Sequence, residues 1–497
     1  MTSIHNILEE RISNKKFFPN LKPFQKSEYI FLALFAFFVP ISWRIATYVM
    51  IGLFISCILK GIFEEGFKIN KLQYKNKAVY FISMAFWAIY AVSFLYSDNS
   101  IEARIQIGKK LSFLLFPLFF LTSDLSYLTK EKVRTIMYCF VSGILTLFIV
   151  NLIWAGYDVI FNEKDPIRIT SYYKFFKTNA VLETPHRAHF SMFTCLGLVF
   201  CFTEFFKSKS IKIKIFNFIS AVILFILPFF VTSRAGILCM ILLFIILLSW
   251  LIFIKKETKT GIIAGLTILS FLMISYFAFP KSINRFTEAI DKVRDGNGDI
   301  RLTLRNSCKN ILEENLIFGV GVGDRNDITM KAHYEYRDQL TTDILNAVNA
   351  DSLFLQKGDK ELYCEYADTT YKYVNDLFDK DKYAFIHDDL AEFRSIGNCI
   401  IRKLNAHNQY SDTIIAVGIL GLIPLLVLFL APVYLWIKNK KFDIIFFSLL
   451  FIITFNCLFE SVFERQMGIM FFAFFYFLFF HADFCQQKAD NNLEINE

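Results

Sequence analysis

The sequence has few of the features that mark a soluble protein with a separate catalytic domain. Charged residues make up only 20% of its 497 residues, and we find no internal repeat and no Pro-, Gly- or Ser-rich linker. The ten cysteines include no CxxC pair, so most are expected to be small buried hydrophobes. The first 27 residues lack the apolar stretch of a cleavable signal peptide, so the first helix is the expected insertion signal.

Apolar residues are abundant instead. The chain is 55% hydrophobic with a mean hydropathy of +0.44, and its 60 phenylalanines are spread through runs longer than soluble cores use. A helix needs about 20 predominantly apolar residues in a row to cross the bilayer core. The sequence therefore predicts an all-α, polytopic integral membrane protein with about twelve transmembrane helices. They are expected near 28–42, 45–60, 78–96, 109–122, 134–156, 187–206, 212–231, 236–254, 259–279, 412–436, 442–459 and 466–481.

Positive charge decides how the first two stretches run. They form either one long tilted span or a hairpin broken near Pro40 and Arg44. A hairpin puts the basic turns and the basic N-terminal tail on one side, which the positive-inside rule identifies as cytoplasmic, with both termini. We favour the hairpin. The turn residues are Lys60, Lys68, Lys71, Lys75, Lys77, Lys130, Lys132, Arg134, Lys207, Lys209, Lys212, Lys214, Lys255, Lys256, Lys259, Lys438, Lys440 and Lys441.

Five regions follow from this topology. A cytoplasmic tail (1–27) precedes nine helices (28–279), one large external loop (280–411), three helices (412–481) and a second cytoplasmic tail (482–497). The net charge of +8 is accounted for by the cytoplasmic turns. It gives no indication of a nucleic-acid partner, because no basic and aromatic surface remains outside them.

The start of the external loop has the pattern of a helix. Arg301 and Arg305 lie four residues apart, so their guanidinium groups share a face. The stretch 318–324 that follows carries three glycines. A nucleotide-binding loop fits poorly because no strand precedes it, and we favour a tight turn where backbone approaches another segment closely. The helical repeat consists of Leu304, Cys308, Ile311, Leu312 and Asn315.

The rest of the loop gives weaker signals. From about 333 to 394 we expect short helices over the outer face. Neighbouring residues on a helix do not converge on one ion, so we interpret the cluster His387–Asp389 as a solvated polar face rather than a metal site. One disulfide with a free thiol, or three free thiols, are both compatible with Cys308, Cys364 and Cys399.

Three groups of polar residues lie at helix ends on the external side. Arg234 is in a short turn between two spans, where a snorkelling surface arginine competes with a functional one. Glu460 and Glu464 share a helical face beside Arg465, which suits a local ion pair. The third group opens another span and consists of His186, Arg187 and His189.

His407 closes the external loop and precedes an apolar helix at about 412–436. The start of that helix favours a neutral, basic imidazole and attracts phosphate. The topology puts His407 on the same side as Arg234, Arg301 and Arg305. Arginine binds phosphate oxygens bidentately and keeps its charge when partly desolvated. The set suits a lipid-tailed substrate with a phosphate or pyrophosphate head, and a group transfer that needs a base.

Four short patterns occur in a fixed order along the chain. They are Thr232–Gly236, then Arg301 and Arg305 ahead of Asn315–Gly323, then His407–Tyr410 followed by Ala416–Leu422, and finally Glu460–Ser461. With the late external loop, their order and spacing resemble the O-antigen ligase family of bacterial cell-envelope enzymes, which also includes O-antigen polymerases and related protein glycosyltransferases. Compared with that family, the stretch 331–400 looks like a long insertion.

The resemblance implies a metal-independent glycosyltransferase of the bacterial inner membrane, with a periplasmic site and no cofactor. It would move a glycan from an undecaprenyl-pyrophosphate carrier to an acceptor hydroxyl of the lipid A core or another envelope glycan. His407 matches the family's loop histidine, Arg234 its short-turn arginine, and Arg301 or Arg305 its loop arginine. Secondary candidates are His186, His189 and Glu460.

We hypothesise that His407 takes the acceptor proton while the acceptor oxygen attacks the anomeric carbon. The pyrophosphate leaves from the opposite face, so configuration inverts, and Arg234 with Arg301 or Arg305 neutralises its charge. An O-antigen or exopolysaccharide polymerase of the same family is an alternative. A transporter of polysaccharide or lipid-linked glycan is the alternative from another class, although the charged residues lie at helix ends rather than along a path through the membrane.

Overall fold

The protein is built from helices. The computed structural model describes residues 21–65, 76–161, 185–278, 300–348, 395–397, 399–401 and 405–485, and no strand occurs in these ranges. The first half of the chain forms α3 (Pro23–Phe38), α4 (Trp43–Lys60), η1 (Gly61–Glu65), α5 (Lys77–Val92), η3 (Ser93–Tyr96), α6 (Ser100–Lys109), α7 (Ser112–Thr122), α8 (Lys130–Phe161), α10 (Arg187–Lys207) and α11 (Ile211–Phe230). The second half forms α12 (Arg234–Ser249), η5 (Trp250–Ile254), α13 (Thr258–Ala278), α15 (Ile300–Ser307), α16 (Lys309–Glu314), α17 (Arg325–Val348), α20 (Gln409–Asn439), α21 (Ile444–Cys457), η7 (Val462–Glu464) and α22 (Gln466–Phe484).

The all-α, multi-pass membrane prediction is confirmed. Ten helical segments in the described ranges are long and apolar enough to cross a membrane. Each of the predicted apolar stretches coincides with a helix, although α3 and α21 are shorter, with 16 and 14 residues. The helices α6 and α7 together make up one candidate span, Ser100–Thr122.

The first two stretches form a hairpin. The helices α3 and α4 pack against each other and are separated by a turn over residues 39–42, which includes Pro40. Lys60 ends α4 and places its Nζ 3.3 Å from Oε2 of Glu28, near the start of α3. The two helices are therefore antiparallel, as the charge pattern predicts.

Several lysine-rich helix ends lie together at one end of the bundle, which we call the basic end. Lys60 donates to the carbonyl of Asp124 at 3.3 Å, and Lys132 donates to the carbonyl of Tyr127 at 3.0 Å. An ion pair between Arg134 and Glu204 joins the start of α8 to the end of α10. The opposite end of the bundle, which we call the loop end, holds the starts of α10, α12 and α20 and the turn between α21 and α22.

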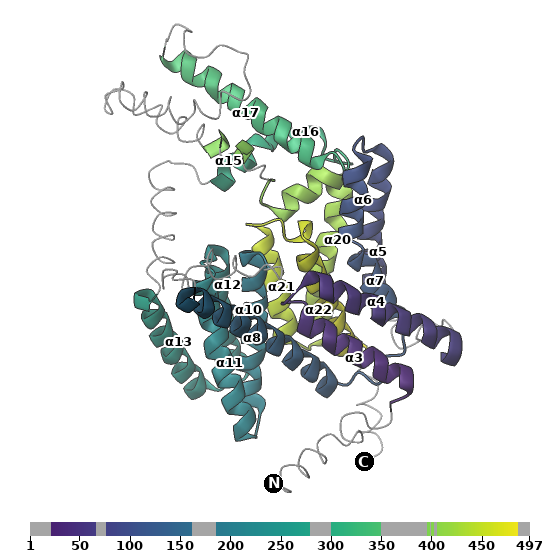
Figure 1. Ribbon diagram of the computed structural model, residues 1–497, viewed down its shortest axis with the longest axis vertical. Helices are drawn as coiled ribbons and strands as arrows, with labels where there is room; N and C mark the ends of the chain where they lie inside the picture. Colours follow the sequence, from purple (N-terminus) through teal and green to yellow (C-terminus); the bar gives the residue numbers. More distant parts are fainter. Residues whose placement is uncertain are drawn as a thin grey trace.

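The helices α22 and α10 form the centre of the bundle. Their hydrophobic windows are 89% and 83% buried, whereas that of α13 is 12% buried and lies at the edge (Figure 1). Phenylalanines of three other helices pack on α22, with ring centroids 4.6 to 4.7 Å apart in the pairs Phe35–Phe474, Phe140–Phe475 and Phe193–Phe471. Such aromatic pairs contribute about 0.5–1.5 kcal/mol each beyond their buried area.

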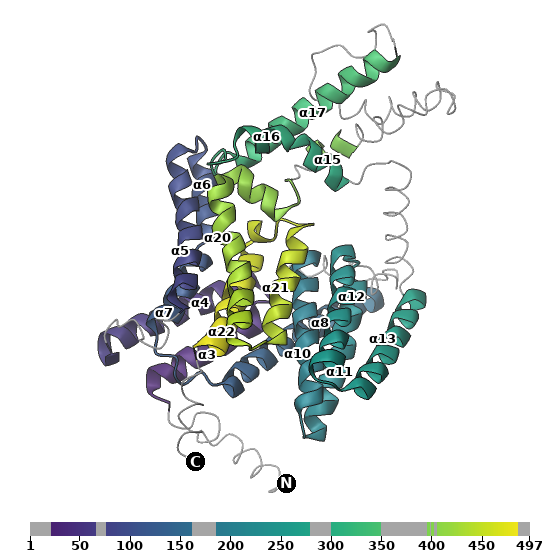
Figure 2. The same ribbon diagram turned by 180° about the vertical axis from the view of Figure 1, so that it is seen from behind.

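The helices α15, α16 and α17 lie beyond the loop end, and we call them the outer module (Figures 1 and 2). The predicted helix over 301–315 is split near Cys308, a buried free thiol. In place of short helices from 333 onwards, α17 continues as one helix to Val348. Some of the predictions fall outside the described residues. They concern the cluster His387–Asp389, Cys364, and residues 1–20 and 486–497 of the two predicted tails.

The helix α20 is broken at Gly418, so the expectation of one continuous helix over 412–436 is wrong at this point. Gly418 has φ 68° and ψ −168°, a conformation that is essentially restricted to glycine. The backbone groups freed by the break pair with residues 316–321. The bonds are Val320 N–H to Ile415 O at 2.8 Å, Gly321 N–H to Ala416 O at 3.1 Å, and Ile419 N–H to Leu316 O at 2.8 Å.

The glycine-rich stretch 318–324 is a tight turn at this contact, as predicted. Gly321 has φ 97°, and a Cβ added there would lie 2.5 Å from Oγ of Ser97. The carboxylate of Asp324 accepts the backbone N–H groups of Asp98 and Asn99, both at 2.8 Å, where α6 begins. The turn therefore fastens the outer module to both α20 and α6.

Candidate functional site

His407 lies directly before the N-cap residue of α20. Asn408 is the N-cap, and its side-chain oxygen accepts the N–H groups of Tyr410 and Ser411 at 2.9 and 3.1 Å. Its amide also donates to the carbonyl of Leu458 at 3.2 Å. His407 itself has φ 47°, a left-handed conformation that non-glycine residues rarely adopt and that clusters at functional sites. Asn408 thus occupies two of the first N–H groups of the helix, and phosphate binding at this end stays a prediction.

His407 pairs with Glu460. Its Nδ1 lies 3.3 Å from Oε2 of Glu460, and the side chains remain 27% and 18% exposed. A carboxylate next to Nδ1 favours the tautomer with the proton on that nitrogen and leaves Nε2 as the proton acceptor. This pair has the two parts of a general base, a proton acceptor and a group that orients it.

Arg234 begins α12 at the same end of the bundle. Ser233 caps the helix by accepting the N–H of Gly236 at 3.2 Å, and its hydroxyl lies 3.1 Å from that of Ser191 in α10. In the same helix α10, His189 Nε2 donates to the carbonyl of Val462 at 3.2 Å. Contacts through α10 thus connect the turn of Arg234 with the turn that carries Glu460.

His186 and His189 lie next to this turn. Their ring centroids are 6.0 Å apart, and the Nδ1 atoms of both are buried without a hydrogen-bond partner among the described residues. Burial, followed by the neighbouring His189 and the charge of Arg465, lowers the pKa of His186 to about 3. His186 is therefore neutral near pH 7.

The loop arginines lie in the outer module. Arg305 is exposed on α15, and the side chain of Arg301 lies outside the described part of the chain. One turn after Arg305, Cys308 shares a small hydrophobic cluster with Ala406, the residue before His407. The structure thus brings α15 towards the His407 loop, and among the described residues no hydrogen bond or ion pair joins Arg305 to His407 itself.

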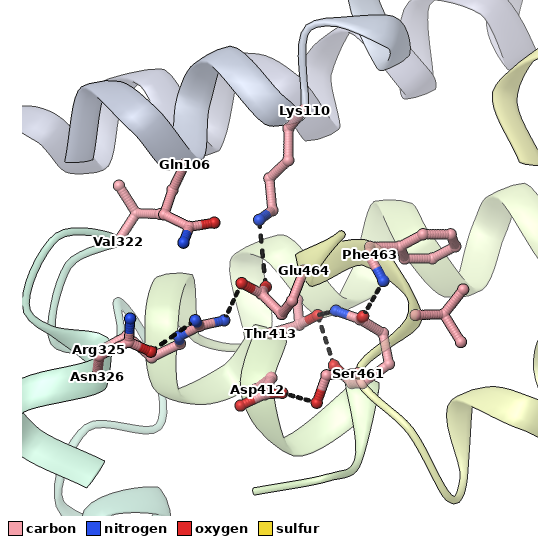
Figure 3. Close-up of polar contacts among 12 residues, drawn as sticks. Gln106, Lys110, Val322, Arg325, Asn326, Asp412, Thr413, Ser461, Phe463 and Glu464 are labelled. Atoms are coloured by element: carbon pink, nitrogen blue, oxygen red, sulfur yellow. Dashed lines mark hydrogen bonds and ion pairs between the residues drawn. The ribbon is translucent and has the colours of Figure 1, made fainter. Parts of the chain in front are cut away.

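Sequence reasoning missed a buried ion cluster next to the turn that carries Glu460 (Figure 3). Glu464 forms ion pairs with Arg325 of α17 and, at 3.2 Å, with Lys110, the C-cap of α6. Nearby, the hydroxyl of Ser461 donates to the buried carboxylate of Asp412. Arg325 and Lys110 are 4% and 0% exposed, so both cations are removed from water.

Charges in the cluster stabilise one another. Burial opposes the charge on Arg325, but the carboxylates of Glu464 and Asp412 outweigh it and raise the pKa of the guanidinium. Burial likewise opposes the charge on Glu464, and Arg325 and Lys110 overcome it and hold the pKa of the carboxyl below its usual range. Arg325 and Glu464 are therefore ionised together.

This cluster corrects the prediction for the last external turn. The ion pairs of Glu464 are with Arg325 and Lys110, rather than the local pair with Arg465, whose side chain is exposed. Residues 462–464 form a single 3₁₀ turn, so Glu460 and Glu464 do not share a helical face. The local spacing could not reveal partners 139 and 354 residues away. The available signals were Lys110 at the start of the predicted stretch 109–122 and Arg325 directly after the glycine stretch 318–324.

Fold and site together define a multi-pass helical membrane protein with a histidine–glutamate pair and an arginine turn at one end of its bundle. A family model described as O-antigen ligase matches residues 219–357. The resemblance to the O-antigen ligase family is therefore confirmed over this part of the chain, which includes Arg234, Arg301, Arg305 and Arg325 and ends before His407. The match supports a ligase- or polymerase-type action on lipid-linked glycans. No curated protein matches the chain.

Proposed function

We propose that the protein is a membrane glycosyltransferase that moves a glycan from an undecaprenyl-pyrophosphate carrier to an acceptor hydroxyl, as an O-antigen ligase does. The observation that carries the proposal is the contact between His407 and Glu460, a partly exposed acid–base pair at the same end of the bundle as the Arg234 turn. The family match over residues 219–357 supports the class of donor.

In the proposed reaction, Nε2 of His407 takes the proton of the acceptor hydroxyl. The acceptor oxygen forms a bond to the anomeric carbon while the bond from that carbon to the pyrophosphate oxygen breaks, so the configuration inverts. The electron pair leaves with the pyrophosphate. Glu460 stabilises the imidazolium that forms, as the carboxylate of a catalytic triad does. The energy comes from the activated bond of the donor.

Arginines neutralise the leaving group in this proposal. Arg234, with Arg301 or Arg305, faces the charge that grows on the pyrophosphate, and preorganised cations are most effective where charge develops. A guanidinium suits this position because it binds two phosphate oxygens at once.

Replacement of Arg234 by lysine is expected to lower the transfer rate by about 10- to 100-fold, because a bidentate charged contact becomes a single one. The measurement is the rate at which membranes carrying the variant attach glycan to the acceptor. Arg104→Lys is the matched control, since Arg104 is an exposed arginine outside the proposed site. Equal rates for Arg234→Lys and wild type would make Arg234 a surface charge.

The proposal places the loop end in the periplasm of a bacterial inner membrane and both termini in the cytoplasm. The clustering of lysine-rich turns at the basic end supports this orientation. A green fluorescent protein fused after Glu497 is expected to fluoresce, and alkaline phosphatase fused there to be inactive. Fusions after Ala350 serve as the reciprocal control. Phosphatase activity at the C-terminus would reverse the orientation and leave the site on the wrong side.

The test of the function is genetic. The gene is deleted in its host and restored, and the envelope glycans are separated on a gel stained for sugar. For a ligase, the deletion removes long glycan from its anchor while lipid-linked chains accumulate. An anchor that carries only a single repeat would indicate a polymerase instead. An unchanged pattern would contradict both and point to a protein acceptor or to a transporter.

A further inference from the structure

The turn between α21 and α22, residues 458–465, is fastened from four directions. Its backbone and side chains contact the start of α20, the start of α10, the α6–α7 segment and the outer module. The contacts are Asn408 Nδ2 to Leu458 O at 3.2 Å, His189 Nε2 to Val462 O at 3.2 Å, Phe463 N–H to Gln409 Oε1 at 2.6 Å, Ser461 Oγ to Asp412, Lys110 Nζ to Glu464 at 3.2 Å, and Arg325 to Glu464.

Glu464 is the residue of this turn that forms two ion pairs. Its side chain is 9% exposed and receives two cations from segments far apart in the sequence. Arg325 is the first residue of α17 and lies directly after the glycine turn. The other terminal nitrogen of its guanidinium, Nη2, donates to Oδ1 of Asn326 at 2.8 Å. A buried carboxylate that keeps two cations is fixed more rigidly than the exposed polar turn of an ordinary helical hairpin.

Glu460 lies on the same short turn as Glu464. Glu460 lies four residues before Glu464, and the carbonyl of Glu460 accepts the N–H of Val462 at 3.0 Å within the same short turn. Its carboxylate must stay 3.3 Å from His407 for the pair to exist. A displacement of the order of 1 Å at a reacting group costs roughly 100-fold in rate.

We infer that Arg325 is a positioning residue: through Glu464 it holds the 458–465 turn in the register that keeps Glu460 against His407. The inference rests on the proposed function, because it assumes that the His407–Glu460 pair does the chemistry. It also gives the outer module a role in the site, since Arg325 acts on the geometry of the pair through Glu464.

A double-mutant cycle between Arg325 and Glu460 tests the inference. The purified protein is reconstituted in vesicles with lipid-linked glycan extracted from the deletion strain, and kcat and KM are measured. Arg325→Met is expected to lower kcat by about 10- to 100-fold with KM for the donor within about twofold. In a Glu460→Ala background the same substitution is expected to have no further effect, because the group that it positions is gone.

Arg325→Lys and Arg337→Met separate positioning from a general loss of structure. Lysine keeps a cation for Glu464 and is expected to recover most of kcat. Arg337 lies further along α17 and is 9% exposed, so Arg337→Met removes a comparably buried arginine from the same helix. It is expected to leave kcat within about twofold. Equal losses for Arg325→Met and Arg337→Met would show general damage to the module and overturn the inference.

The two proposals fail in different ways. If Glu460→Ala and His407→Ala both transfer glycan at the wild-type rate, the proposed function of the pair is wrong. If both lose activity but the losses of Glu460→Ala and Arg325→Met multiply, the pair stands and the positioning role of Arg325 is wrong.

Discussion

Replacement of His407 by alanine is expected to lower the rate of glycan transfer by about 10²- to 10⁴-fold, the usual contribution of a positioned general base. The protein should reach the membrane in normal amounts, because His407 is 27% exposed and its ring contacts Glu460 rather than the apolar core. The measurement is the rate of transfer by membranes that contain equal amounts of wild-type and variant protein.

His407→Asn is the matched variant. Asparagine tolerates the left-handed backbone that His407 adopts at φ 47°, and its amide can donate to Glu460, but it cannot take a proton. It is therefore expected to be as inactive as His407→Ala. Activity restored by asparagine would make His407 a structural residue and transfer the role of base to His186 or His189.

Gly418→Ala is expected to destabilise the folded protein by at least about 3 kcal/mol. A Cβ at this position would lie 1.9 Å from the carbonyl oxygen of Ile317, and the backbone has φ 68°, where alanine is strained. Relief of the clash would move residues 316–321 away from α20 and break the hydrogen bonds that join the two segments.

Thermal unfolding of the detergent-solubilised protein measures this effect. Gly265→Ala is the matched control, because a Cβ there would lie 3.6 Å from Leu248, an ordinary contact within a candidate span. The control is expected to melt with wild type, while Gly418→Ala melts far lower or is recovered unfolded. Overlapping curves for Gly418→Ala and wild type would mean that α20 is not broken at this glycine.

Sequence patterns determined much of the architecture. Hydropathy predicted where the helices lie, because a bilayer requires long apolar segments. Positive charge predicted which turns lie on the same side, because lysines gather at one end of the bundle. The break in α20 could not be predicted in this way. Gly418 sits within an apolar run that reads as an ordinary span, and only its pairing with residues 316–321, about 100 positions earlier, makes the break favourable.

The residues of the candidate site that could be predicted are those that stand out from their immediate sequence neighbours. His407 and Arg234 stood out because each is a polar residue at the start of an apolar helix. The pairing of His407 with Glu460 and of Arg325 with Glu464 depends on how distant segments pack, and spacing along the chain carries no information about that. The glycine pattern 318–324 was predicted to approach backbone closely, but its partner, the broken part of α20, emerged only from the fold.

We propose that this protein transfers a glycan from a pyrophosphate-linked lipid with His407 as the base. The most direct measurement supplies lipid-linked glycan from the deletion strain, with acceptor-bearing membrane extract, to vesicles of wild-type or His407→Ala protein. Both glycan attached to the acceptor and free undecaprenyl pyrophosphate are followed. We expect wild type to produce both products in equal amounts and His407→Ala to produce almost none. Glycan that crosses the vesicle membrane still attached to its lipid, with no pyrophosphate released, would contradict this mechanism and identify a transporter.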